Sequence, residues 1–329
     1  MRLKAILCLL LVAIILVGCN AQPTETTAEP TSVPKITQSP EEQTVTKILI
    51  LGNSHSGDTF WQLQKVFQTE LPDQQFAFGY LYYSGCPIKK HVEFAYSNAP
   101  EYIYRINADG YWTEYREATM QMALKDQAWD YIVLQPGRAD ADENYALDAR
   151  RKLESYVAEY VKQPYQLLWQ TTWANPTDKV FFSPEWPVQP PAGTEETLIR
   201  LYGHNNVTQF TKSTDIAKQH ILTDDTYAKK MCIGSAIMHA ILVQDRPQTE
   251  IYRDYTHLTD FGRLIASYSF FAQFTGQKLT AVNVDVVPTY LRMSRYQSEG
   301  DLIVTEEMKQ IIIEAVNYSV ENPWTVPTK

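Results

Sequence analysis

One short stretch, residues 47–57 (Lys-Ile-Leu-Ile-Leu-Gly-Asn-Ser-His-Ser-Gly), does most to limit the fold that this chain can adopt. Its four consecutive aliphatic residues, 48–51, predict a strand buried on both faces. A Gly-Asn turn ends the strand, and a helical pattern follows, with Asp58 or Thr59 as the candidate N-cap. Ser54 is therefore expected at the carboxyl end of a parallel strand, where α/β proteins place their ligands. The alternative interpretation is an ordinary strand-to-helix turn with a capping serine.

Strands and helices alternate along most of the chain. We predict strands at residues 48–51, 74–83, 129–135, 165–170 and 231–235, a hairpin at 102–115, and helices at 114–127, 143–161, 195–220, 236–243, 260–275 and 305–320. A proline-rich loop is expected at 174–193. Alternation of this kind predicts an α/β fold: three α/β/α layers around a mostly parallel five-stranded sheet, flavodoxin-like in type.

The first residues of the chain have the pattern of an export signal. Arg2 and Lys4 precede a thirteen-residue apolar run, which is short for a membrane span and typical of a signal peptide. The run ends in Leu-Val-Gly-Cys19, which resembles the lipobox of bacterial lipoproteins. We therefore expect a lipoprotein signal peptide at 1–19 and a lipid anchor on Cys19 that attaches the protein to the extracytoplasmic face of a membrane in the bacterial cell envelope.

A folded domain is expected to follow a solvated tether. Residues 20–46 contain four prolines, many threonines and no aromatic residue, a composition typical of a disordered linker. Hydrophobic residues make up 44% of the 329-residue chain, enough for a sizeable core. We predict one domain over 47–329, with a C-terminal helical extension.

Charge and cysteine usage exclude several classes of function. The formal net charge is −9 with no basic patch, so nucleic acid is not an expected partner. No Cys/His spacing indicates a metal site, and no cofactor is expected. Cys86 and Cys232 could form a disulfide in an oxidising compartment, although their positions at the ends of separate predicted strands favour two buried thiols.

A base for Ser54 is found 200 residues further along the chain. A serine hydroxyl is a weak nucleophile and needs a histidine within hydrogen-bond reach, held in the right tautomer by a carboxylate. Asp254-Tyr-Thr-His257 supplies such a pair in a polar loop just before a predicted helix. The loop is expected at the same edge of the sheet as Ser54, so these three residues form a candidate catalytic triad.

The combination of Gly52-Asn53-Ser54 after the first strand with Asp254-x-x-His257 near the end resembles the SGNH (GDSL-type) hydrolase superfamily. Residues 129–135, 166–173 and 257–276 resemble a branch of it that consists mainly of uncharacterised bacterial proteins. The resemblance covers roughly 47–276 and implies that Ser54 is the nucleophile, His257 the base and Asp254 its orienting partner.

The resemblance also implies an oxyanion hole. The backbone N–H of Ser54 would be one donor, and Gly85, in the turn after the second strand, matches the family's glycine donor. The third block departs from the family pattern, because Leu-Gln135-Pro-Gly stands where an asparagine donor is usual. Gln135 could supply a side-chain N–H instead, or it merely ends the strand and the hole has two donors.

Two further residues are candidates for binding substrate. His91 follows the Gly85 turn and could line the site. Trp173 falls at the loop edge of the sheet, where an aromatic face could stack on a sugar ring or serve only in packing.

These features lead to a functional prediction: an extracytoplasmic, lipid-anchored serine hydrolase, a carboxylic-ester esterase acting through an acyl-serine. The resemblance and the compartment suggest a small-molecule or glycan ester, such as an O-acetyl group on a carbohydrate. Two alternatives remain open: an O-acyltransferase acting on a glycan, and a non-catalytic glycan-binding lipoprotein with a vestigial site.

Overall fold

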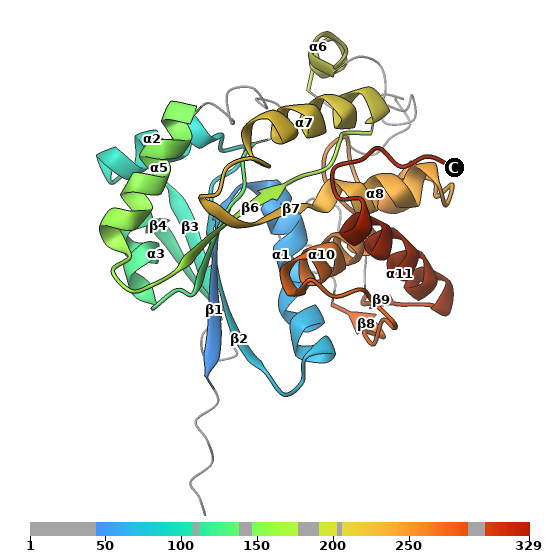
Figure 1. Ribbon diagram of the computed structural model, residues 1–329, viewed down its shortest axis with the longest axis horizontal. Helices are drawn as coiled ribbons and strands as arrows, with labels where there is room; N and C mark the ends of the chain where they lie inside the picture. Colours follow the sequence, from blue (N-terminus) through green and yellow to red (C-terminus); the bar gives the residue numbers. More distant parts are fainter. Residues whose placement is uncertain (1–43, 108–111, 138–146, 177–190, 203–205, 289–299) are drawn as a thin grey trace, which may run out of the picture. The chain divides into compact units, whose positions relative to one another are not determined.

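A mostly parallel sheet is the framework of the computed structural model, which describes residues 44–107, 112–137, 147–176, 191–202, 206–288 and 300–329 (Figure 1). Seven strands form this sheet in the described residues, in the spatial order β4 (Thr113–Ala118), β3 (Tyr102–Ile106), β2 (Gln75–Tyr82), β1 (Val45–Gly52), β5 (Tyr131–Leu134), β6 (Gln166–Thr171) and β7 (Tyr227–Cys232). The five strands from β2 to β7 in this order run parallel, whereas β3 and β4 are antiparallel additions.

The strand count differs from the sequence prediction for an identifiable reason. The predicted hairpin pairs with the edge of β2, with Gly79 opposite Ile106 and Tyr82 opposite Ile103, so the sheet has seven strands and not five. Main-chain groups at the edge of a sheet are open to further pairing, and nothing in the hairpin's own sequence shows which edge it will join.

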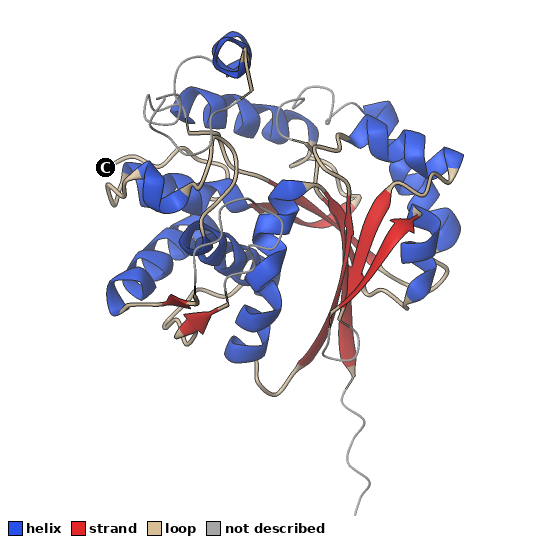
Figure 2. Cartoon of the chain, turned by 180° about the vertical axis from the view of Figure 1, so that it is seen from behind, coloured by secondary structure: helices blue, strands red, loops and turns tan. Residues whose placement is uncertain are grey.

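Helices cover both faces of the sheet (Figures 1 and 2). The helices are α1 (Ser54–Glu70), α2 (Ile88–Ser97), α3 (Met120–Asp126), α5 (Leu147–Tyr160), α6 (Thr194–Tyr202), α7 (Asn206–His220), α8 (Ile233–Leu242), α9 (Gln248–Ile251), α10 (Asp260–Thr275) and α11 (Glu306–Glu321). A small antiparallel pair, β8 (Val286–Val287) and β9 (Leu302–Ile303), lies apart from the main sheet. Among the described residues, no helix has the length and apolar character needed to cross a bilayer.

Strand β1 shows how the two faces of the sheet are buried. Ile48 and Ile50 belong to the core shared with α1, α8, α10 and α11, whereas Leu49 and Leu51 belong to the core shared with α2, α3, α5 and α7. All four side chains are at most 1% exposed. Successive strand residues point to opposite faces, so an uninterrupted aliphatic run is what a central strand between two helical layers requires.

Several element boundaries differ from the predicted ones. The predicted helix over 195–220 corresponds to two helices, α6 and α7, and β7 occupies 227–232 where the sequence suggested 231–235. Strand β4 runs on to Ala118, and Thr119 then caps α3 by accepting a hydrogen bond from Met122 N. Most of the predicted proline-rich loop, residues 177–190, lies outside the described residues, as do 1–43, which contain the predicted signal peptide and most of the tether.

The two cysteines of the folded part are free and buried. Cys86 lies in the turn after β2, and Cys232 ends β7. Burial raises the pKa of the Cys86 thiol to about 12, so this group is protonated at neutral pH. The structure thus agrees with the buried-thiol alternative.

Strand order also locates the candidate site. The chain moves from β1 to β2 on one side and later returns to place β5 on the other side of β1. In open α/β sheets the crevice for a ligand lies at the carboxyl ends of the strands where the winding direction reverses. Ser54 immediately follows β1, and the Gly85 turn and Gln135 follow the two strands that flank it.

Substitution of Phe67 in α1 should cause one of the larger losses of stability among the core residues. Its ring is fully buried and lies within 4.7–6.4 Å of the rings of five other phenylalanines, measured between centroids. We expect Phe67→Ala to lower the free energy of unfolding by about 3–5 kcal/mol, because the cavity cannot close fully. Urea denaturation measures this. Ile303→Ala is the control: Ile303 is 70% exposed, so a change within about 0.5 kcal/mol is expected. Equal losses of unfolding free energy in the two variants would show that Phe67 is not a major part of the core.

Candidate active site

The turn that carries Ser54 is built by its neighbour Asn53. The Asn53 carboxamide oxygen accepts a hydrogen bond from His55 N at 3.0 Å and so caps α1, which begins at Ser54. The predicted caps were wrong because Asn53 offers its side chain one turn earlier than Asp58. Close packing also requires Gly52, since a Cβ there would lie 2.1 Å from Ser56 Oγ. Ser54 itself is partly exposed.

Gln135 supports the turn from the end of β5. Its side-chain oxygen accepts hydrogen bonds from Asn53 N at 3.1 Å and from Ser56 N at 3.2 Å. Its amide N–H donates to the carbonyl of Pro136, and the side chain is fully buried. The side-chain N–H that the sequence analysis considered for the oxyanion hole therefore has another partner, and the role seen here is to fix the serine turn.

A second turn, after β2, lies against the first. Asn53 Nδ2 donates to the Cys86 carbonyl at 3.2 Å, and Tyr83 N donates to the Gly52 carbonyl at 3.3 Å. Gly85, between them, has φ +62°, a left-handed conformation that favours glycine. Within the described part of the chain, the backbone N–H groups of Gly85 and Ser54 have no hydrogen-bond acceptor. These two donors, which the sequence analysis named, are thus available on adjoining turns.

Asp254 and His257 meet in a short hairpin before α10, residues 252–258, which we name the base loop. Tyr252 pairs with Leu258 as an antiparallel bridge. Asp254 Oδ1 accepts hydrogen bonds from Thr256 N at 2.8 Å and from His257 N at 2.7 Å, and its Oδ2 lies 2.9 Å from His257 Nδ1. A carboxylate can only accept, so Nδ1 carries the proton and Nε2 is left to act as a base.

Electrostatics keep Asp254 ionised. Burial alone would raise the pKa of this carboxyl group, but the hydrogen bonds from the His257 ring and from the backbone N–H groups of His257 and Thr256 outweigh burial, and the pKa lies below its ordinary value. Asp254 therefore presents a negative charge to the imidazole at neutral pH.

The base loop lies beside the first turn of α1. The His55 ring stacks with the His257 ring at 6.0 Å between centroids, and His55 Nε2 lies 3.2 Å from Thr256 Oγ1. Since His55 adjoins Ser54 in the sequence, the candidate base and nucleophile are in one neighbourhood. Between the described residues the structure records no hydrogen bond from Ser54 Oγ to His257; catalytic hydrogen bonds are often long before substrate binds.

Three charged residues, whose role the sequence analysis missed, link α1 to the base loop and to α10. Asp58 is 2% exposed, and its carboxylate accepts hydrogen bonds from Arg253 Nη1 at 3.1 Å and Arg263 Nε at 2.8 Å. Burial acts to raise the pKa of Asp58, but the two guanidinium groups hold it well below its usual range. A signal was present in the sequence: Arg263 interrupts an apolar helical pattern, and a buried arginine needs an acidic partner.

The two predicted substrate-binding side chains are in the interior. His91 of α2 is 1% exposed, its Nδ1 lies 2.9 Å from the Tyr102 hydroxyl, and burial lowers its pKa to about 4. Trp173 is also 1% exposed, donates from Nε1 to the Thr256 carbonyl at 3.0 Å, and packs on the His55 ring. Neither side chain offers a surface to a substrate. Trp173 instead holds the base loop through its hydrogen bond to Thr256.

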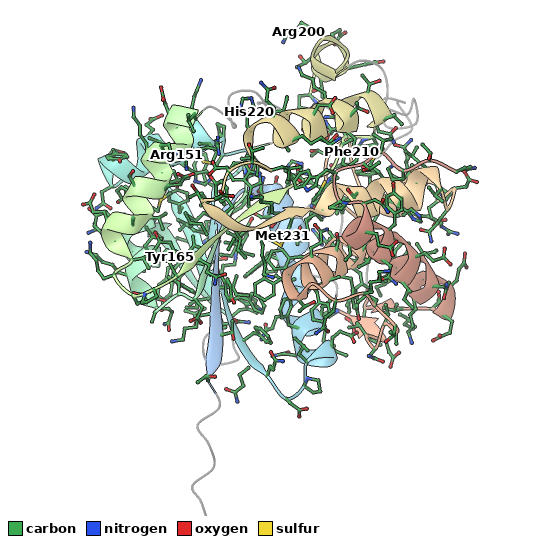
Figure 3. All side chains as sticks on the ribbon, in the orientation of Figure 1. Arg151, Tyr165, Arg200, Phe210, His220 and Met231 are labelled. Atoms are coloured by element: carbon green, nitrogen blue, oxygen red, sulfur yellow. The ribbon has the colours of Figure 1, made fainter. Side chains whose placement is uncertain are left out.

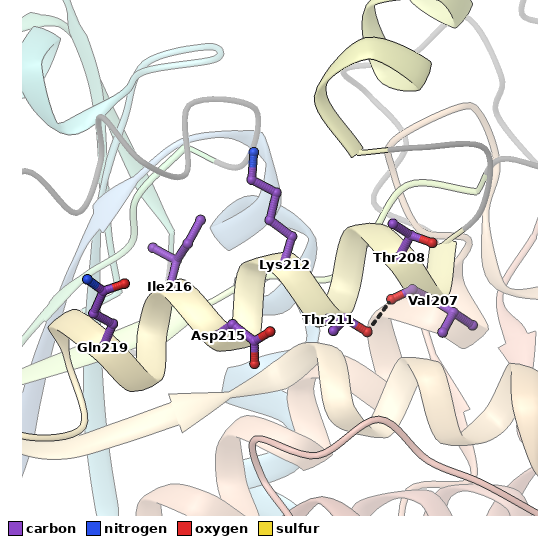
Figure 4. Close-up of a pocket in the computed structure, with 7 residues that line it drawn as sticks. All are labelled: Val207, Thr208, Thr211, Lys212, Asp215, Ile216 and Gln219. Carbon is purple, nitrogen blue, oxygen red and sulfur yellow. Dashed lines mark hydrogen bonds between the residues drawn. The ribbon is translucent and has the colours of Figure 1, made fainter.

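A pocket of about 450 Å³ lies elsewhere, along α7 (Figure 4). Its described lining residues come from one side of that helix: Val207, Thr208, Thr211, Lys212, Asp215, Ile216 and Gln219. Phe210, on α7 as well (Figure 3), is instead buried, and the start of α8 packs closely on it at Gly234. None of the candidate catalytic residues lines this pocket.

Comparisons with known proteins bear on the fold. Residues 47–181 match a protein-family model described as a domain of unknown function (DUF4886). A crystal structure of a DUF4886 family protein from Bacteroides uniformis ATCC 8492 resembles this chain with a TM-score of 0.64 and 24% identity, covering 86% of this chain and 98% of that one. This likeness shows a shared fold.

A second solved structure is more distant. LAE5, an alpha/beta hydrolase enzyme from the metagenome of Lake Arreo, Spain, has a TM-score of 0.41 and 12% identity over 70% of this chain and 95% of that one, too remote to bear on function. No curated protein matches this chain.

The support that Gln135 gives to the serine turn can be tested by removing its side chain. We expect Gln135→Ala to lower the free energy of unfolding by about 1–3 kcal/mol, because two buried N–H groups lose their acceptor. Gln127→Ala is the matched control: Gln127 accepts a hydrogen bond from Lys47 Nζ near the surface, where water can replace the lost amide. Thermal and urea denaturation of both variants measure the difference. Similar losses in both would mean that Gln135 does not stabilise the turn.

Proposed function

We propose that this protein is a serine hydrolase of the SGNH (GDSL) type that cleaves a carboxylic ester through an acyl-serine intermediate. The observation that carries the proposal is the 2.9 Å contact of His257 Nδ1 with Asp254 Oδ2, in a loop that lies against the residue next to Ser54. A histidine oriented by a carboxylate near a partly exposed serine at a helix N-terminus is the arrangement that nucleophilic acyl transfer needs.

The proposed reaction uses each group in turn. Ser54 Oγ attacks the ester carbonyl carbon while His257 Nε2 takes the hydroxyl proton. The negative charge on the carbonyl oxygen is met by the N–H groups of Ser54 and Gly85. The alcohol then leaves with the proton from His257. Water, deprotonated by the same imidazole, attacks the acyl-serine; the Ser54 Oγ–carbon bond breaks, the imidazolium returns its proton to Ser54 Oγ, and the carboxylic acid is released. This scheme uses no metal ion or cofactor.

Labelling with a fluorophosphonate probe tests the proposal, because the probe reacts only with an activated serine. We expect the wild type to be labelled at Ser54, Ser54→Ala to be unlabelled, and His257→Ala to react at least about 10³-fold more slowly. Ser97→Ala is the control, since Ser97 Oγ donates to the Glu93 and Phe94 carbonyls of its own helix, α2. No labelling of folded wild-type protein would reject the proposal in favour of a binding lipoprotein.

The nature of the acceptor follows from a second measurement on the same protein. We propose a glycan O-acetyl ester as the substrate class, from the predicted cell-envelope compartment and not from any described residue. Release of p-nitrophenol from p-nitrophenyl acetate with water alone as acceptor supports the hydrolase. Turnover that requires an added sugar supports the O-acyltransferase.

We also propose that the protein is lipid-anchored through Cys19, on the strength of the apolar run and the Leu-Val-Gly-Cys19 sequence. In a bacterial host, the wild type should sediment with membranes and Cys19→Ala should not, because the thiol that receives the lipid is gone. Cys8→Ala, which changes a cysteine inside the apolar run, is the matched control and should sediment. Soluble wild-type protein would contradict the anchor.

A further inference from the structure

The N-terminal part of α1 contacts the base loop on both sides of His257. His55 Nε2 lies 3.2 Å from Thr256 Oγ1, which precedes the histidine. Asp58 Oδ2 accepts a hydrogen bond at 2.8 Å from Leu258 N, which follows it. The helix that begins with the candidate nucleophile therefore fixes the backbone that carries the candidate base.

Arg253 lies between two carboxylates and is hydrogen-bonded to only one of them, Asp58. Arg253 Nη1 donates to Asp58 Oδ1 at 3.1 Å and to the Leu258 carbonyl at 2.6 Å. Its Nε is 4.0 Å from Asp254 Oδ2 and is buried without a hydrogen-bond acceptor. That same Asp254 oxygen is the one closest to His257 Nδ1.

We propose that Asp58 is a positioning residue that keeps the Arg253 guanidinium off Asp254, so that Asp254 remains the partner of His257 alone. Asp58 touches neither Ser54 nor His257 by hydrogen bond in the described residues; it acts through Arg253 and Leu258. The inference rests on the proposed function, since it assigns a role toward the same catalytic base.

The physical reason is competition for one oxygen. Hydrogen bonds between guanidinium and carboxylate groups are charge-assisted and strong, and a buried arginine without a partner is costly. If the charge of Asp58 is removed, the nearest remaining carboxylate for Arg253 is Asp254. An Arg253–Asp254 pair would reduce the negative charge that His257 senses and would draw Oδ2 away from Nδ1.

Other charged and titratable groups lie around the base loop, and they decide which carboxylates the two arginines can pair with when Asp58 is changed. On α1 these are His55 and Asp58; on α10 they are Arg263 and Asp260, which pair with each other at 3.1 Å. Because Arg263 also has Asp260, it keeps a carboxylate when Asp58 is changed. Among the described residues, Arg253 has no hydrogen-bonded carboxylate other than Asp58, and the next carboxylate in reach is Asp254 at 4.0 Å, the one that the base uses.

The test is the rate of fluorophosphonate labelling of the purified chain across pH 5 to 9, with folding checked by circular dichroism. Asp58→Asn keeps an oxygen to accept from Leu258 N but loses the charge. We expect labelling to slow by about ten- to a hundredfold, and the acid-side midpoint of the rate to move to lower pH, because the imidazole binds its proton less tightly. Asp260→Asn, the matched control, removes a carboxylate from Arg263 and should leave both rate and midpoint unchanged.

A double variant separates positioning from simple stability. Adding Arg253→Gln to Asp58→Asn removes the competing cation, and we expect the labelling rate and the midpoint to return close to wild type. If Asp58→Asn alone does not fold, the double variant carries the test by itself. A rate as low as that of His257→Ala would overturn the inference.

Other outcomes are equally decisive. An Asp58→Asn protein that labels at the wild-type rate with the wild-type midpoint overturns the inference while leaving the serine hydrolase intact. A uniform loss at every pH that Arg253→Gln does not restore shows a structural role only, and also overturns it. Absence of labelling in the wild type is a different result, because it rejects the proposed function first.

Discussion

The buried Asp58 carboxylate is the interaction on which the candidate site depends. About 200 residues further along the chain, it holds the base loop through Arg253 and the Leu258 N–H, and it holds α10 through Arg263. Neither side of this contact is stable alone: an unpaired buried charge costs several kcal/mol. The ion cluster therefore forms only when α10 docks on α1, and docking brings the base loop to the serine turn. The chemistry of the site and the packing of these helices are two results of the same contact.

The serine turn is fixed by a different kind of interaction, a set of neutral hydrogen bonds in a space with no room for a side chain at Gly52. Asn53 caps the helix, reaches the Cys86 carbonyl, and offers its own carbonyl to the Tyr80 hydroxyl. Gln135 accepts from the turn on the other side. Three parallel strands thus each contribute to one rigid turn, which suits a group that must be held in place before substrate arrives.

The sequence was sufficient for the features that depend on local pattern. The aliphatic run 48–51 predicted a central strand, and the short spacing of Asp254 and His257 predicted their contact, which lies within one hairpin. It was insufficient where long-range pairing decides. The predicted hairpin pairs with β2 and so adds two strands to the sheet. His91, a polar residue close to a turn, is in the interior because α2 packs against the sheet there. The sequence left Gln135 either as an oxyanion donor or as the end of a strand, because the orientation of its side chain depends on the serine turn that it contacts.

The same ion cluster links stability to acidity with a definite sign. The folded-state pKa of Asp58 lies well below the ordinary value of an aspartate, 3.8. Its stabilising contribution is therefore fully present above that value and is lost as the pH falls toward the folded-state pKa. At neutral pH Asp58 is therefore ionised, and its contacts with Arg253 and Leu258 hold the base loop at full strength. Acid that protonated Asp58 would leave Arg253 without a charged hydrogen-bond partner, whereas Arg263 would keep Asp260, so the contact between the loop that holds His257 and α1 should weaken.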